Sequence, residues 1–197
     1  MKIPAAVEET YEVLVDELRY ATTAWQVLRA CTEELGDLSG HGNPADSVAR
    51  FMRHAVESDV TLAVCRLLDN HKDAATFKSL LTQLPPPVCE DIQKTLKTVS
   101  TEHKQVKWAR DTSLAHIDKG PRRTIAKEGF KEPAELFALN GVPKILDAVG
   151  QALAQIGTYY KCRPPRIDTS PALHAEVLAF LKRALECPAP CQPSAPQ

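Results

Sequence analysis

Apolar residues recur at every third or fourth position through most of this chain, and no segment shows the sustained two-residue alternation of a half-buried strand. The pattern therefore predicts an all-α protein. A first helix is expected from about Ala5 to Glu34, and a second from an N-cap at Asp46 or Ser47 to about Asn70. A short helix is expected around Ala75 to Leu84, because consecutive prolines follow it.

The same spacing predicts which side chains of the first two helices are buried. The expected buried stripe of the first helix is Val7, Tyr11, Leu14, Leu18, Ala21, Trp25 and Leu28. The expected buried stripe of the second helix is Val48, Met52, Ala55, Leu62 and Leu68. These two stripes would supply much of an apolar core.

A third long helix is expected to start near Val88 and to run without a break to Asp118, where Lys119, Gly120 and Pro121 end it. Two polar residues, His103 and Arg110, fall on its apolar stripe. The other members of that stripe are Ile92, Leu96, Val99, Val106, Ser113 or Leu114, and Ile117. An arginine at a core-facing position costs free energy unless it is paired, so Arg110 marks either a functional or a salt-bridged site.

Two more helices are expected, from Pro143 through about Lys161 and from about Ser170 to Glu186. The first of them should bury Ile145, Val149, Leu153, Ile156 and Tyr160. The composition from Cys187 onward is rich in Pro, Ala, Ser and Gln, which predicts a disordered tail over residues 188–197. Residues 1–187 are expected to form a single domain, since the chain is short for two.

Composition limits the classes of protein to which the chain can belong. Hydrophobic residues make up 44% and charged residues 25%, which is typical of globular proteins. No segment approaches the roughly 20 apolar residues of a membrane span, and the N-terminus lacks a secretory signal, so we expect a cytoplasmic protein with no membrane partner. The net charge is -1, so any binding of nucleic acid must depend on local basic patches. The six cysteines lack metal-ligand spacing, so free thiols and no metal site are expected.

The end of the third long helix carries the residues that suggest chemistry. His116 follows Arg110 at a distance of about 9 Å along an ideal helix and on a different face. The two side chains would meet only if the helix loosens before Gly120, or if two copies pack about a two-fold axis and pool both pairs. An imidazole and a guanidinium in one cleft suit RNA cleavage by the RNA's own 2′-hydroxyl, without a metal or other cofactor.

The segment from Trp108 to Lys119 resembles the motif of the HEPN superfamily, in which an arginine is followed by a polar residue and, after a short spacer, by a histidine. The segment ends in Ala-His-Ile-Asp-Lys, which is similar to the motif of the abortive-infection branch of the AbiU type. The sequence Arg-Leu-Leu-Asp at residues 66–69 is similar to a pattern associated with the same branch. The resemblance spans roughly Ala5 to Leu185 in helix order, but only these two segments are specific.

This resemblance implies a bundle of about five to six helices that dimerises with its motifs facing each other. It implies a metal-independent endoribonuclease of toxin–antitoxin or phage-defence systems, with RNA as substrate and a cognate antitoxin or defence protein as a further partner. The positions that match the catalytic motif are Arg110, Asp111 and His116, and Arg66 and Asp69 would support them. The tyrosine that some HEPN toxins carry two residues after the histidine is replaced here by Asp118.

The stretch that follows His116 is locally basic, which suggests contacts with RNA phosphates. Its candidate substrate-binding residues are Lys119, Arg122 and Arg123. A solvated loop explains the same charges. For His103, a satisfied interior histidine is favoured over a ligand.

The other candidate residues also have structural explanations. Arg110 can pair with a carboxylate of the second helix, Asp59 or Asp69, while His116 caps a helix end. Arg66 and Asp69 can form a surface ion pair within one helix. The alternative function is then a non-catalytic helical module that binds a partner protein or a nucleotide in a defence or regulatory system, and a third is a purely structural adaptor.

Overall fold

The computed structural model describes residues 3–35, 44–69, 75–111, 141–162 and 171–186, and within these ranges every regular element is a helix. The all-α prediction is confirmed. The predicted tail at residues 188–197 lies outside the described residues, as does the segment from 112 to 140. No helix that the structure describes has the length and apolar character needed to cross a bilayer.

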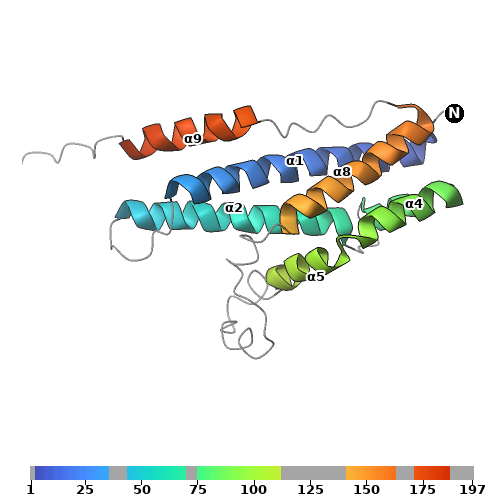
Figure 1. Cartoon of the computed structure of the whole chain (residues 1–197), viewed down its shortest axis with the longest axis horizontal. Coiled ribbons are helices and arrows are strands. Elements are labelled where there is room, and N and C mark those ends of the chain that lie inside the picture. Colours follow the sequence, from blue (N-terminus) through green and yellow to red (C-terminus); the bar gives the residue numbers. More distant parts are fainter. Residues whose placement is uncertain (1–2, 36–43, 70–74, 112–140, 163–170, 187–197) are drawn as a thin grey trace, which may run out of the picture.

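Two long helices, α1 (Ala5–Leu35) and α2 (Pro44–Leu68), lie side by side and run in opposite directions (Figure 1). The helix α8 (Gly141–Tyr160) packs against α1 and also contacts α4 (Pro86–Lys97) and α5 (Ser100–Ala109). The short α3 (Phe77–Leu81) contacts α1 and α2, and α9 (Pro171–Glu186) lies along α1. The predicted helix limits agree within a few residues, except in the third long helix.

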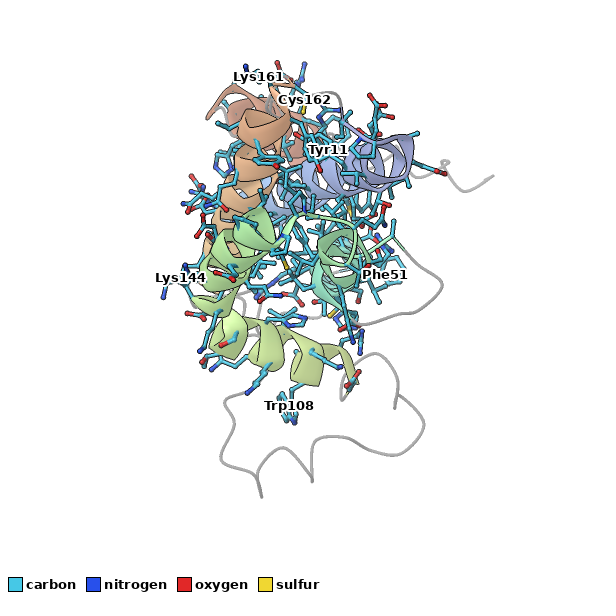
Figure 2. The ribbon with its side chains drawn as sticks, turned by 90° about the vertical axis from the view of Figure 1, so that its right-hand side faces the viewer. Tyr11, Phe51, Trp108, Lys144, Lys161 and Cys162 are labelled. Atoms are coloured by element: carbon cyan, nitrogen blue, oxygen red, sulfur yellow. The ribbon has the colours of Figure 1, made fainter. Side chains whose placement is uncertain are left out.

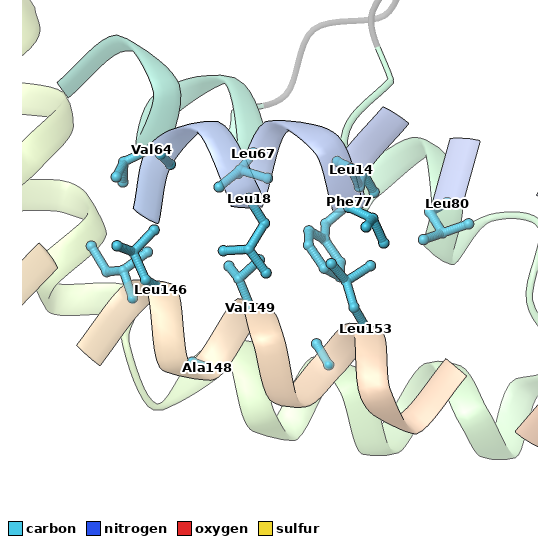
Figure 3. Close-up of a cluster of buried hydrophobic side chains, with 14 of the residues drawn as sticks. Leu14, Leu18, Val64, Leu67, Phe77, Leu80, Leu146, Ala148, Val149 and Leu153 are labelled. Atoms are coloured by element: carbon cyan, nitrogen blue, oxygen red, sulfur yellow. The ribbon is translucent and has the colours of Figure 1, made fainter. Parts of the chain in front are cut away.

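The core lies between α1, α2, α3 and α8. Figure 3 shows Leu14 and Leu18 of α1 opposite Val149 and Leu153 of α8, with Leu67 of α2 beside them. The stripe predicted for α1 is confirmed, with Trp25 only partly buried. The stripe predicted for α8 is also confirmed, because Ile145, Val149, Leu153, Ile156 and Tyr160 are all buried.

The stripe predicted for α2 is wrong over much of its length. Met52, Ala55 and Leu62 are exposed, and Val48 lies among the side chains that are not described. The buried face carries Val60, Ala63, Val64 and Leu67 instead. Apolar residues occur all round α2, so spacing alone does not select a face, and the selection comes from contacts with α1, α3, α5 and α8.

The third long helix is broken, contrary to the expectation of one helix from Val88 to Asp118. α4 ends at Lys97 and α5 begins at Ser100. Backbone amides of Thr98 and Val99 bond carbonyls three residues back instead of four, and the Thr98 hydroxyl donates to the Thr95 carbonyl at 2.6 Å. Threonine hydroxyls that bond helix carbonyls in this way bend helices. The break lets α5 leave the direction of α4 and pack against α2 (Figure 1).

Candidate functional site

The candidate site forms where the end of α5 meets the residue that follows α2. α5 is followed by a π-type turn at Arg110 and Asp111, a distortion that is frequent at functional sites. In Figure 2, α5 lies at one edge of the bundle and Trp108 points away from the other helices. Arg110 is therefore at a boundary between core and surface, and its side chain is 22% exposed.

Asp69 is the buried partner of this arginine. Its residue is only 5% exposed, and its backbone amide donates to the Cys65 carbonyl at 2.7 Å, which extends the hydrogen bonding of α2 by one residue. Nη1 of Arg110 donates to Oδ2 of Asp69. Nε of Arg110 donates to Oδ1 of Asp111 at 2.9 Å, and Nη2 lies 2.8 Å from the same oxygen. The guanidinium is thus held between two carboxylates.

Two more basic side chains of α5 approach Asp69. Nε2 of His103 lies 3.7 Å and Nζ of Lys107 lies 3.8 Å from Oδ1 of Asp69. Positions 103, 107 and 110 share one face of a helix, which explains how a single helix brings all three to the same carboxylate. Neither His103 Nε2 nor Asp69 Oδ1 has a hydrogen-bond partner among the described residues.

The electrostatics of the cluster follow from burial and from these charges. Burial lowers the pKa of His103, Lys107 and Arg110 lower it further, and Asp69 acts in the opposite direction. Burial alone would lower the pKa of Arg110, but its hydrogen bonds to Asp69 and Asp111 outweigh this and raise the pKa. Burial also raises the pKa of Cys65 to about 11, so this neighbouring thiol is not a thiolate nucleophile at neutral pH.

The structure therefore unites three of the residues singled out from the sequence: Asp69, Arg110 and Asp111. Of the two carboxylates considered as structural partners of Arg110, Asp69 is the one that binds it. Asp59 instead accepts a hydrogen bond from the Tyr20 hydroxyl at 2.6 Å. The other candidates, His116, Lys119, Arg122 and Arg123, lie outside the described residues.

Arg66 does not form the ion pair with Asp69 that its spacing suggested. Its Nε lies 2.8 Å from Oε1 of Glu17, and its guanidinium lies 5.9 Å from the centre of the Tyr20 ring. Arg66 thus joins α2 to α1. It does not share the carboxylate of Asp69 with Arg110. The reason is that Asp69 lies beyond the end of α2 and turns inward, whereas Arg66 faces the surface.

The residue that sequence reasoning underrated is His103. It lies in the interior, as expected, but its Nε2 atom faces a carboxylate without a hydrogen bond in the described part of the chain. The signal was available, because His103 shares the stripe of Arg110. Within the described ranges, no three His, Cys, Asp or Glu side chains are grouped so as to hold a metal ion.

An all-α bundle with an Arg-Asp pair at the end of a helix, followed in the sequence by Ala115-His116, has the features of a HEPN-type protein. The model of the HEPN family AbiU2 matches residues 5–162. The chain therefore belongs to the AbiU2 family of HEPN-type abortive-infection proteins. The match includes both motif segments and runs from α1 through α8, while α9 lies beyond it. No curated protein and no solved structure matches the chain.

Proposed function

We propose that this protein is a metal-independent endoribonuclease that cleaves single-stranded RNA at a composite Arg/His site between two copies of the chain. The observation that supports the proposal best is the state of Arg110. Its guanidinium is oriented by the buried Asp69 and by Asp111, yet its side chain remains 22% exposed. A guanidinium held in this way is positioned to donate hydrogen bonds to a phosphate group.

Arg110 would stabilise the charge that develops on the phosphate. A guanidinium has more N–H donors than the two carboxylates engage, so donors remain for phosphate oxygens. Because the two carboxylates already hold the group, little reorganisation is needed when the charge develops, and such preorganised groups contribute strongly to catalysis. Asp111, with a side chain 51% exposed, would orient the arginine from the solvent side.

His116 would move the proton. In this scheme His116 accepts the proton of the 2′-hydroxyl as the 2′-oxygen attacks phosphorus, the bond from phosphorus to the 5′-oxygen breaks, and the leaving oxygen takes up a proton from an imidazolium. The products would carry 2′,3′-cyclic phosphate and 5′-hydroxyl ends. The basic residues Lys119, Arg122 and Arg123 would contact flanking phosphates. A two-fold homodimer would pool the arginine and histidine of both chains.

The same ion pair also favours a second candidate, a non-catalytic module that binds a partner protein, such as a cognate antitoxin, or a nucleotide. A buried Asp69 needs a cation, so Arg110 can be explained by stability alone. In that case the exposed part of the guanidinium would bind an acidic group of the partner. Catalysis separates the two candidates.

The test is cleavage of single-stranded RNA by the wild-type protein and by variants at His116 and Arg110. His116→Ala should lower the rate roughly 10²- to 10⁴-fold. Arg110→Lys is preferable to Arg110→Ala, because alanine leaves the buried Asp69 unpaired, whereas lysine keeps the charge but loses the planar fork. It should cause a loss of the same order, and Asp111→Asn should be milder, since the amide oxygen still accepts a hydrogen bond.

The matched controls are His54→Ala on α2 and Arg29→Lys on α1, both at exposed positions. They should cleave at the wild-type rate. Cleavage should persist in EDTA, and a substrate with deoxyribose at the scissile position should resist. Wild-type protein that cleaves no RNA above the level of His116→Ala would refute the nuclease and leave the binding module.

A further inference from the structure

The two oxygens of Asp69 have different surroundings. Oδ2 accepts a hydrogen bond from Arg110, whereas Oδ1 is buried and has no hydrogen bond among the described residues. A buried carboxylate oxygen without a donor costs free energy, and among the described residues the carboxylate is hydrogen-bonded through Oδ2 alone. A group that held Oδ1 would fix the direction of the carboxylate that, together with Asp111, orients Arg110.

The group best placed to hold Oδ1 is the imidazole of His103. Its Nε2 atom is buried, lies 3.7 Å from Oδ1 and likewise lacks a hydrogen bond in the described part of the chain. With the proton on Nε2, a neutral imidazole donates to a carboxylate after a small closing movement. One movement would thus provide partners for two buried polar atoms.

Lys107 is the weaker alternative. Its Nζ lies 3.8 Å from Oδ1, but its side chain is 48% exposed, compared with 20% for His103. A solvated ammonium on a long flexible stem loses side-chain entropy when it is held in one place, so it defines a geometry poorly. Lys107 contributes charge near Asp69, whereas the rigid and mostly buried ring of His103 can define a direction.

We propose that His103 is a positioning residue, which donates from Nε2 to Oδ1 of Asp69 and thereby fixes the carboxylate that orients Arg110. In this role the imidazole acts on Arg110 through Asp69, since its buried Nε2 atom faces that carboxylate. In its effect on catalysis this inference rests on the proposed nuclease function. The chain of contacts, however, can be tested without RNA.

The direct test is NMR of the Arg110 guanidinium in ¹⁵N-arginine-labelled protein, with the resonance assigned by its loss in Arg110→Lys. A held guanidinium gives a protected Nε–H signal and slow rotation of its terminal nitrogens. In His103→Leu the signal should broaden or exchange faster with water. His103→Gln keeps an amide N–H donor and should restore the wild-type signal. The matched control His54→Leu, at an exposed histidine of α2, should have no effect.

Activity provides the second readout. His103→Leu should lower kcat about 10- to 100-fold, as does the loss of groups that orient metal ligands, while KM changes little. His103→Gln should recover most of kcat. If His103→Leu leaves the Arg110 signal unchanged, or His103→Gln fails to restore it in a folded protein, the inference is overturned. If the NMR result holds but the wild-type protein cleaves no RNA above the level of His116→Ala, the positioning role stands and the nuclease proposal fails.

Discussion

At the scale of single residues, the site is organised around the buried carboxylate of Asp69. This carboxylate lies within 4 Å of an imidazole and an ammonium from α5 and of the guanidinium of Arg110, the residue that follows α5. Removing either partner of such a pair leaves the other charge uncompensated, which is why a conservative change such as Arg110→Lys reports on function better than truncation does. The charges of the same cluster also affect the pKa of His103.

The lowered pKa of His103 predicts how stability depends on pH. Folded protein binds a proton at His103 more weakly than the unfolded chain, whose pKa is near 6.5. As pH falls below 6.5, the unfolded state therefore binds more protons and the free energy of unfolding decreases. The decrease ends below the folded pKa, and the contribution of His103 is fully recovered above about pH 7.5.

The measurement is chemical denaturation of the wild type and of His103→Gln at about pH 7.5 and about pH 5.5. The wild type should lose more unfolding free energy between the two pH values than the variant, which has no titrating group at this position. His54→Gln, which changes an exposed histidine, should behave like the wild type. Equal losses in the wild type and in His103→Gln would show that burial does not depress the His103 pKa.

At the scale of elements, short polar interactions decide where helices begin and break. The hydroxyl bonds of Thr95 and Thr98 accompany the break between α4 and α5, which directs α5 toward Asp69. At the start of α3, Thr76 and Ser79 form a reciprocal capping box, with Thr76 Oγ1 accepting from the Ser79 amide at 3.3 Å and Ser79 Oγ accepting from the Thr76 amide at 2.9 Å. This cap starts the short helix that packs Phe77 and Leu80 into the core.

Thr76→Ala should therefore lower the unfolding free energy by roughly 1 kcal/mol, because the Ser79 amide loses its acceptor near a buried position. Urea denaturation measures the change. The matched control is Thr23→Ala at an exposed position within α1, where alanine is a better helix former and no loss is expected. A Thr76→Ala protein as stable as the wild type would mean that the cap contributes nothing beyond the packing of Phe77.

At the scale of the whole molecule, the bundle leaves some large apolar side chains uncovered. On α2 these are Phe51, Met52 and Leu62. The partly buried Trp108 points away from the other helices near the end of α5 (Figure 2). The Arg/His mechanism proposed above requires that two copies meet near Arg110. A partner copy that contacts α5 near Arg110 would also meet Trp108, which lies two residues before Arg110 in the sequence.

We therefore expect a two-fold homodimer whose interface includes α5. Sedimentation at micromolar concentration should give twice the 21.7 kDa of one chain. Trp108→Glu should dissociate the dimer, because it places a charge in an apolar interface. Tyr159→Glu, at an exposed aromatic residue on α8, should leave the dimer intact. A wild-type protein that sediments as a monomer would argue strongly against a shared site.

The amino-acid sequence by itself determined the features that depend on neighbours along one helix. The limits of α1 and α8 and their buried stripes follow from the 3.6-residue period, because every third or fourth side chain faces the same way. The sequence alone also showed the motif around Arg110 and the family resemblance. Even the pairing of Arg110 with Asp69 was among the alternatives, since a core-facing arginine needs a carboxylate.

Only the tertiary structure decided features that depend on residues far apart in the chain. It selected Asp69 over Asp59, which is bound by Tyr20, and it selected the face of α2 that is buried. It also brought His103 to an oxygen of Asp69 that local spacing could not identify as unpaired. In each case several partners satisfy the local chemistry equally well, and the choice is made by packing energy summed over helices that are distant in the sequence.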